Sequence, residues 1–179
     1  RRLQWRHGSD AVIATAQCIK DEILNKGLAA ATRIHVIGEW ADDAFFDISG
    51  RAQHQEDVRA EFQVPAGDAL VAVVGMLRGD KAQEHLIHTT AEMKRRGHPI
   101  TALIVGSATN TQDTYEAELR ALAAKLGVTD RVRFAGYRDD VARLTQGADI
   151  LAITSTAVEA QSRTAPQGFA SLTPVVASN

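Results

Sequence analysis

The chain has 179 residues, an ordinary globular composition and nearly balanced charge. Hydrophobic residues make up 45% and charged residues 23%, values that exclude a disordered or fibrous protein. With 20 lysines and arginines against 22 acidic residues, the formal net charge of −2 offers no general attraction for nucleic acid or for an acidic membrane. Any anionic ligand must therefore be held by a local arrangement of groups. At this length we expect one full domain and part of another.

Cysteine usage and hydropathy indicate the compartment. Cys18 is the only cysteine, so an intramolecular disulfide is impossible and a reducing, cytoplasmic environment is expected. No stretch approaches the ~18 consecutive apolar residues of a membrane span, and residues 1–7 lead into no apolar run that would make a signal peptide. Because the sequence does not begin with Met and its end, Pro174–Asn179, reads as an internal strand, we expect a piece of a longer chain.

The first part of the chain predicts a small, separate β-α-β unit. Its expected strands are Asp10–Thr15 and Arg33–Ile37, with a helix at Gln17–Lys26 between them. The stretch Ala41–Val58 is polar and irregular, which is typical of a linker. We therefore predict a domain tail and crossover in residues 1–45 and a second domain in residues 46–179.

In the second part, apolar runs of strand length alternate with segments of helical period. The expected strands are Leu70–Gly75, Thr101–Gly106, Arg131–Ala135, Ile150–Thr154 and Pro174–Ala177. The expected helices are Lys81–Arg96, Thr111–Leu126, Asp139–Gln146 and Arg163–Ala170. Nearly continuous apolar strands indicate burial on both faces. The predicted fold class is therefore α/β, a Rossmann-like and mostly parallel sheet with helices on both faces.

The segment from Val73 to Lys81 is the first candidate site. It runs from a strand through a glycine turn, Gly75, to an expected helix start that carries two cations, Arg78 and Lys81. In open α/β sheets, ligands lie beyond the carboxyl ends of the strands, where helix N-termini offer free N–H groups, so a phosphate is the natural ligand. The alternative is that both cations are solvated surface charges. Neither a P-loop nor a G-x-G-x-x-G sequence is present, so an ATPase or a dinucleotide enzyme is unsupported.

A second candidate site follows the expected strand Ile150–Thr154. A polar loop leads there into the next expected helix, so free N–H groups from Ser162 to Thr164 should face the same sheet edge. Glu159 lies in this loop, and Gln167 follows about two helical turns later. Taken alone, such a glutamate is usually a solvated charge or a helix cap.

The order of these motifs resembles a known family. The glycine loop with Lys81 is followed by Phe134–Tyr137, by Asp149–Ile150, by the stretch Glu159–Gln167 and by the strand Pro174–Ala177. This order is similar to the donor-binding domain of the group-1 (family 4) glycosyltransferases, which are GT-B proteins with two facing Rossmann-like domains. The resemblance covers about residues 70–179, and the upstream β-α-β unit resembles the last part of that family's acceptor-side domain.

The resemblance implies transfer of a sugar from a nucleoside diphosphate sugar, with retention at the anomeric carbon, no bound metal and no other cofactor. It assigns the donor diphosphate to Arg78, Lys81, Ser162, Arg163 and Thr164, the ribose to Gln167, the base to backbone near Gly136 and Tyr137, and donor-sugar hydroxyls at the catalytic centre to Glu159. The expected acceptor is a surface polysaccharide or a lipid-linked carbohydrate, with no nucleic-acid partner. Family habit places such an enzyme in the cytoplasm, with peripheral association to the inner face of the membrane through an N-terminal half.

Four residues depart from the family pattern. Met76 replaces the arginine after the strand glycine, although Arg78 is close enough in sequence to serve the same phosphate. Ala82 and Leu172 replace glycines, and Gln167 replaces a carboxylate but can still accept a hydrogen bond from a ribose hydroxyl. Two alternatives therefore stay open, namely a nucleotide-sugar epimerase or phosphorylase of the same fold and a non-catalytic nucleotide-binding domain.

Other candidate sites are weaker. His85 and His88 lie three positions apart on an expected helix, but no third metal ligand is apparent. No G-x-S-x-G sequence surrounds Ser155 or Ser162, so hydrolase chemistry with a serine nucleophile is not indicated.

Overall fold

The computed structural model describes residues 9–108, 113–156 and 162–178, which form two compact units. The smaller unit comprises the described residues up to Trp40 together with Ser162 and Arg163. The larger unit begins at Ala41 and contains the rest. The division therefore falls earlier than the boundary expected after residue 45, because the short helix α3 (Asp43–Phe46) belongs to the larger unit.

The smaller unit is a β-α-β arrangement, in the order that the sequence predicts. Its elements are β1 (Val12–Ala14), α2 (Gln17–Asn25), a 3₁₀ turn (Ala31–Arg33) and β2 (Ile34–Val36), and the two strands pair in parallel. Buried Ala14, Ile23, Ala29 and Ile34 form its core. A core of this size is small, as expected for about 30 residues.

The larger unit is built on a five-stranded parallel sheet. Its strands are β3 (Ala69–Val74), β4 (Ile100–Val105), β5 (Val132–Gly136), β6 (Ile150–Ile153) and β7 (Val175–Ala177), arranged in the order β5-β4-β3-β6-β7. The chain enters at the central strand, extends the sheet on one side with β4 and β5, and then crosses to the other side. This confirms the Rossmann-like α/β prediction and creates a switch point between β3 and β6, where ligands of open parallel sheets bind.

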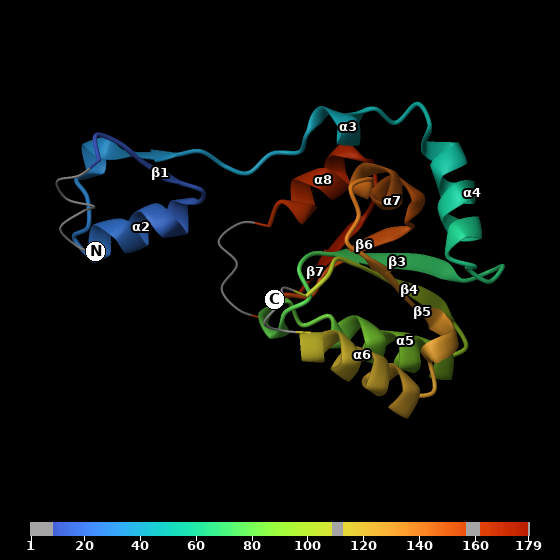
Figure 1. Ribbon diagram of the computed structural model, residues 1–179. Coiled ribbons are helices and arrows are strands. Elements are labelled where there is room, and N and C mark those ends of the chain that lie inside the picture. Colours follow the sequence, from blue (N-terminus) through green and yellow to red (C-terminus); the bar gives the residue numbers. More distant parts are fainter. Residues whose placement is uncertain (1–8, 109–112, 157–161, 179) are drawn as a thin grey trace. The chain divides into compact units, whose positions relative to one another are not determined.

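Helices cover both faces of this sheet (Figure 1). On one face lie α5 (Glu84–Arg95) and α6 (Asp113–Lys125), and on the other lie α4 (Arg51–Glu61), α7 (Val141–Gly147) and α8 (Thr164–Ala170). The parallel strands must therefore be apolar on both sides. Each crossover from strand to strand contains a helix, as βαβ connections require.

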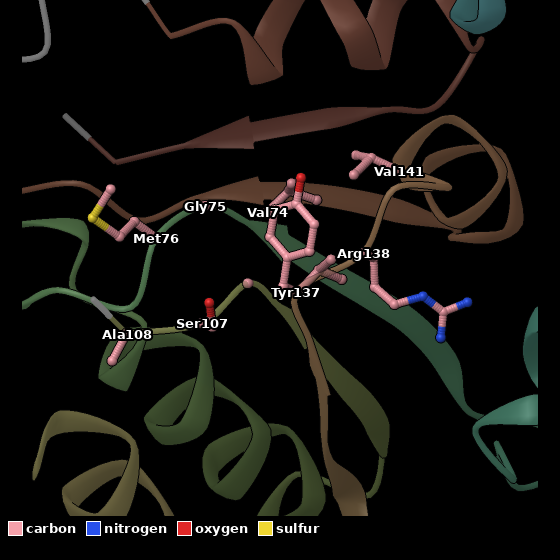
Figure 2. A pocket seen from close by; sticks show the side chains of 10 residues that line it. Val74, Gly75, Met76, Ser107, Ala108, Tyr137, Arg138 and Val141 are labelled. Carbon is pink, nitrogen blue, oxygen red and sulfur yellow. The ribbon is translucent and has the colours of Figure 1, made fainter. Parts of the chain in front are cut away.

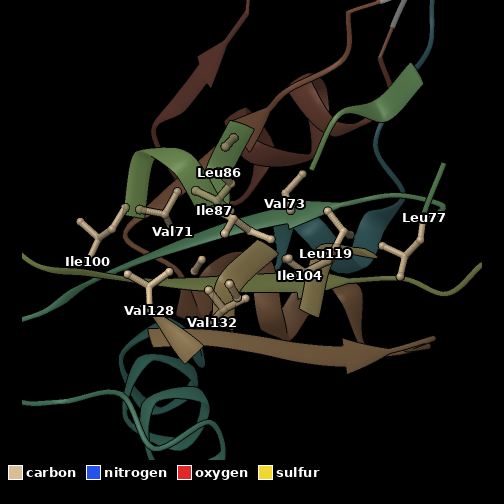
Figure 3. Close-up of a cluster of buried hydrophobic side chains, with 13 residues drawn as sticks. Val71, Val73, Leu77, Leu86, Ile87, Ile100, Ile104, Leu119, Val128 and Val132 are labelled. Carbon is tan, nitrogen blue, oxygen red and sulfur yellow. The ribbon is translucent and has the colours of Figure 1, made fainter. Parts of the chain in front are cut away.

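Successive side chains of β3 divide the core into two layers. Val71 and Val73 point to the α5 and α6 face, where they join Ile87 and Leu119 in the cluster that Figure 3 shows. Leu70 and Ala72 point to the opposite face and pack with Val58 of α4, Leu144 of α7 and Leu151 of β6. Both sets of side chains are buried, so alternate residues of β3 contribute to two hydrophobic cores, one on each face of the sheet.

The predicted linker is wrong over most of its length. Instead of an irregular connection, residues 41–58 contain α3 and most of α4. Val58 of α4 is fully buried, and it packs so closely on α7 that a Cβ added to Gly147 would lie 2.6 Å from the Val58 Cγ2 atom. The other side chains of α4 are largely polar. The α4 sequence therefore shows almost no helical period of apolar residues, although the helix packs against the sheet layer.

The predicted helix start at Lys81 is also wrong. Lys81 ends a 3₁₀ turn (Gly79–Lys81), and α5 begins only at Glu84. Between them, Ala82 adopts a left-handed backbone conformation with φ of +49°, and Leu172, in the turn before β7, has φ of +54°. These are the two positions at which the resembled family carries glycine, the residue that tolerates this conformation without steric cost.

Candidate functional site

Three neighbouring strands each run into a glycine at the carboxyl edge of the sheet. Gly75 and Gly106 directly follow β3 and β4, Gly136 is the last residue of β5, and the N–H group of Gly106 donates to the Gly136 carbonyl oxygen over 2.8 Å. A Cβ added to Gly106 would lie 1.9 Å from the carbonyl oxygen of Gly75, and Gly106 has φ of +139°. Because the backbones of neighbouring strands approach this closely, main-chain atoms form a floor, the surface of the sheet at this edge.

A pocket of about 400 Å³ lies on this floor (Figure 2). Its ten lining residues are Val74, Gly75, Met76, Val105, Gly106, Ser107, Ala108, Tyr137, Arg138 and Val141. They come from the ends of β3, β4 and β5 and from the segments that follow. The volume lies in the range of small-molecule sites, and most of the lining is apolar, as in sites that bind a flat organic group.

Tyr137 gives this pocket an aromatic wall. Its side chain is 74% exposed although it lines the pocket, and Figure 2 shows its ring beside Val74. A hydrogen bond to Asp139 raises the pKa of the Tyr137 phenol, so the ring stays neutral at physiological pH. A neutral and accessible ring suits stacking against a nucleobase.

Arg138 is the single charged residue among the ten described residues that line the pocket, and its charge is already engaged. Its guanidinium donates to both carboxylate oxygens of Asp140, at 2.7 and 2.8 Å, and to Glu61 Oε1 at 2.6 Å. In Figure 2 the guanidinium points away from Met76 and Ser107. The pocket interior therefore suits an uncharged ligand group better than a phosphate.

The loop that carries Lys81 meets the loop after β6 at the switch point. The Thr154 hydroxyl donates to the Lys81 carbonyl oxygen over 2.7 Å, and the Thr156 N–H group donates to the Asp80 carbonyl oxygen over 3.1 Å. Buried Gln83 holds the same loop from the other side, because its amide donates to the Met76 carbonyl oxygen over 3.0 Å. The segment between Gly75 and α5 is thereby fixed at the carboxyl edge, next to the pocket that Met76 lines.

The two predicted cations of this loop both act on the Asp80 carboxylate. The Arg78 guanidinium forms an ion pair with the Asp80 carboxylate, with 2.5 Å between Nη2 and Oδ2. This hydrogen bond holds the pKa of Asp80 below its ordinary value and raises the pKa of Arg78. Lys81 is half-buried beside them. An incoming phosphate would therefore compete with Asp80 for Arg78.

Five further residues carry predicted roles. Glu159 falls outside the described residues. Ser162 and Arg163 belong to the smaller unit, where the Arg163 Nε atom lies 3.6 Å from Glu39 Oε2. Thr164 begins α8, and Gln167 is half-buried in the same helix. The structure thus brings Arg78, Lys81, Gly136 and Tyr137 to one sheet edge, and the roles of all nine predicted residues stay predictions.

Several residues that line the pocket or hold its neighbouring loop were not predicted from the sequence. Gly106, Ser107, Ala108 and Val141 carry no chemical signature of a site, and Gln83 reads as an ordinary helix residue. One available signal was the repetition of an apolar strand that ends in glycine, which occurs three times. Because those strands are neighbours in a parallel sheet, their glycines had to meet at one edge.

Two general features complete the description of the site. Within the ranges that the structure describes, no group of three His, Cys, Asp or Glu side chains is arranged to hold a metal ion. Over the same ranges, no helix combines the length and the apolar character that crossing a membrane requires.

Comparison with known proteins finds one matching family model and several similar proteins. Residues 54–179 match the family model described as glycosyl transferases group 1. The chain is 31% identical over 155 residues to a D-inositol 3-phosphate glycosyltransferase of Salinispora tropica, covering 82% of this chain and 32% of that protein. It is 29% identical to an alpha-D-kanosaminyltransferase of Streptomyces kanamyceticus, covering 71% of this chain and 31% of the relative. The chain thus spans about a third of the length of these curated relatives.

Two solved structures superpose well on this chain. Anabaena HepE, solved in complex with UDP-glucose, superposes with a TM-score of 0.83 at 28% identity over 94% of this chain and 44% of HepE. WaaG, a glycosyltransferase involved in lipopolysaccharide biosynthesis, superposes with a TM-score of 0.83 at 20% identity over 98% of this chain and 46% of WaaG. The second likeness concerns the fold alone.

Proposed function

Because the chain belongs to the group 1 glycosyl transferases, we propose that it binds the nucleoside diphosphate sugar donor of a sugar-transfer reaction at the carboxyl edge of its sheet. One observation carries this proposal. The apolar pocket between the glycine-ended strands adjoins the loop with Lys81, and this loop is bonded to the loop after β6 at the switch point of the sheet. An uncharged base and a charged diphosphate need two such compartments side by side.

The base belongs in the pocket. Its aromatic wall, Tyr137, and its main-chain floor, Gly75 and Gly106, offer stacking and backbone hydrogen bonds without a free charge. We propose uracil as the base, so that the donor is a UDP-sugar, since Anabaena HepE was solved with UDP and with UDP-glucose. The Gly136–Tyr137 backbone, which the family resemblance assigns to the base, lies at the carboxyl end of β5.

The diphosphate belongs beside Lys81. A lysine in a loop that other segments hold at two points acts as a fixed point charge for phosphate oxygens. Arg78 contributes less, because its guanidinium must leave Asp80 before it can bind a phosphate. In this proposal cations and backbone N–H groups stabilise the departing diphosphate without a metal ion.

The sugar and acceptor ends of the reaction rest on the family resemblance. Glu159 would bond the hydroxyls of the donor sugar, Gln167 the ribose, and the amides from Ser162 to Thr164 the phosphates, with retention at the anomeric carbon. For the acceptor we propose a surface polysaccharide or a lipid-linked carbohydrate, reached by peripheral association with a membrane. D-inositol 3-phosphate, for which several relatives are named, is the acceptor to test against it.

The diphosphate assignment is tested by calorimetric titration of the full chain with UDP. Lys81→Ala should weaken UDP binding by about 1.5–3 kcal/mol, which is the size of a lost charge-assisted hydrogen bond. Arg78→Ala should cost less, because the arginine is already paired. Lys94→Ala is the matched control, since this lysine lies on α5 and bonds the Gly127 carbonyl oxygen. Unchanged UDP affinity in the Lys81 variant would refute the assignment.

The catalytic assignment is tested by turnover. In the full-length enzyme, Glu159→Ala should lower the rate of sugar transfer while leaving UDP affinity nearly unchanged, because contacts made at the reacting centre appear in rate. Product analysis with mixed UDP-sugars distinguishes transfer to an acceptor from epimerisation of the donor and from phosphorolysis. Equal losses in turnover and UDP affinity would place Glu159 at the nucleotide instead of the sugar.

A further inference from the structure

A cluster of four charged side chains lies behind one wall of the pocket. Glu61 stands at the end of α4, Arg138 and Asp140 lie between β5 and α7, and Arg143 lies on α7. Arg138 is bonded to Glu61 at 2.6 Å and to Asp140 at 2.7 Å, while Arg143 is bonded to Asp140 at 2.9 Å and also to Glu61. Each carboxylate therefore binds both guanidiniums, and the cluster is closed.

This cluster differs from an ordinary surface ion pair. Its arginine side chains are 25% exposed and its carboxylates 33% and 35% exposed, so water screens the charges only in part. Arg143 and Arg138 hold the pKa of Glu61 below its ordinary value, and Arg138 and Arg143 do the same for Asp140. Networks in which every charge has two partners fix side-chain geometry more firmly than isolated exposed pairs.

The cluster encloses the segment that forms the pocket wall. Tyr137, Arg138 and Val141 line the pocket, and the bonds of Asp140 and Arg143 fix the same stretch of backbone where it enters α7. In Figure 2 the Arg138 guanidinium points away from Met76 and Ser107. It donates to Glu61, which lies 77 positions earlier in the chain. One carboxylate of α4 thus receives both arginines of the wall segment.

We propose that Glu61 is a positioning residue for the nucleotide base, holding Tyr137 and its neighbours in the geometry that the base requires. This inference rests on the proposed function, since it presumes that the pocket takes the base. Glu61 touches no part of the ligand. It acts through Arg138 and Arg143, whereas the Lys81 loop is held by the separate contacts of Gln83 and Thr154.

The two sets of contacts make the proposal testable with two ligands. Full chains carrying Glu61→Gln are titrated with UDP, which has a base, and with inorganic pyrophosphate, which has none. Glu61→Gln should lower UDP affinity by about fivefold to twentyfold, a coupling typical of residues in one bonded network, and change pyrophosphate affinity by less than about twofold. Glu61→Asp, which keeps the charge, should retain more UDP affinity than Glu61→Gln.

The controls separate a positioning role from a general loss of structure. Glu92→Gln is the control variant matched to Glu61→Gln. Glu92 also binds two arginines, Arg95 and Arg96, but it lies on α5 away from the pocket lining. It should change neither affinity. If Glu61→Gln unfolds the chain at the assay temperature, Asp140→Asn removes the other carboxylate and should show the same selective loss for UDP.

The outcomes are distinct. Equal losses for UDP and pyrophosphate, or unchanged UDP affinity in both cluster variants, would overturn the positioning role while leaving the proposed function intact. A wild-type chain that binds neither ligand would instead refute the proposed donor site itself.

Discussion

The two edges of the parallel sheet use side chains in opposite ways. At the amino edge, where the strands begin, charged side chains join one strand to the next. Asp149 accepts the N–H group of Leu70 at 2.7 Å and pairs with Arg59 at 2.5 Å, and buried Asp68 accepts the Thr101 hydroxyl at 2.9 Å. At the carboxyl edge, three strands end in glycine and leave a pocket.

This contrast between the two edges separates charged residues that stabilise the fold from charged residues that could bind a ligand. Each amino-edge carboxylate bonds an arginine and a second donor, the Leu70 N–H group for Asp149 and the Thr101 hydroxyl for Asp68, so that its removal should cost stability and leave binding intact. At the carboxyl edge, the ion pair of Arg78 with Asp80 and the cluster around Glu61 lie in the segments beside the pocket, and the glycine backbone forms the pocket floor. Asp149, one of the residues that carried the family resemblance, belongs by its contacts to the structural edge.

The largest effect should come from breaking the amino edge at Asp68. Its side chain is 3% exposed and pairs with Arg131, so Asp68→Ala leaves a guanidinium that is 18% exposed without its buried partner. We expect a loss of about 3–5 kcal/mol in the free energy of unfolding, measured by urea denaturation. Asp130→Ala is the control, since Asp130 also pairs with Arg131 but is 64% exposed, and it should cost less than about 1 kcal/mol. Equal losses would contradict the role of burial.

At the carboxyl edge, Gly106→Ala tests the close backbone approach. The new Cβ would meet the Gly75 carbonyl oxygen, and the backbone is in a conformation that side chains rarely adopt. We expect a loss of about 2–3 kcal/mol in stability together with reduced UDP affinity. Gly67, before the amino edge, also has positive φ but open space around it, so Gly67→Ala should cost only about 1 kcal/mol and leave UDP binding unchanged. A Gly106 variant with wild-type UDP affinity would argue against the pocket as the base site.

The smallest effects concern two of the three described non-glycine residues with left-handed backbone, Leu172 and Ala82. Leu172→Gly relieves strain at a side chain that is 62% exposed, and it should raise the free energy of unfolding by about 0.5–1 kcal/mol. Ala82→Gly relieves similar strain but removes a buried methyl group, whose loss costs about 0.8 kcal/mol, so the net change should be near zero. Thermal unfolding of both variants measures the difference. Destabilisation by Leu172→Gly would contradict the strain argument.

Much of the fold was predictable because it depends on local patterns. The five apolar strands, their parallel pairing and the helices between them follow from runs such as Leu70–Val74, which only a doubly covered sheet can bury. The family resemblance then located Lys81 and the Gly136–Tyr137 turn, and both lie at the carboxyl edge.

The errors have a common physical cause. Helix α4 was predicted as a linker because Val58 is its single buried residue, and the space that receives Val58 is created by Gly147, far away in sequence. The helix start at Lys81 was predicted from its amphipathic continuation, while Ala82 turns the chain into a left-handed conformation that alanine seldom adopts. Tertiary contacts decided both cases, and neither leaves a periodic signal in the sequence.

The strand order has a consequence for synthesis of the chain. β3 lies at the centre of the finished sheet, but β4 and β5 follow it directly, and its other neighbour, β6, is synthesised last among these four strands. At ~5–20 residues per second, several seconds pass between β3 and β6 leaving the ribosome. During that time this wholly apolar strand has one unpaired edge, which can pair with a strand of another chain. A nascent chain stalled before β6 should therefore pair with other chains more readily than the complete sheet does.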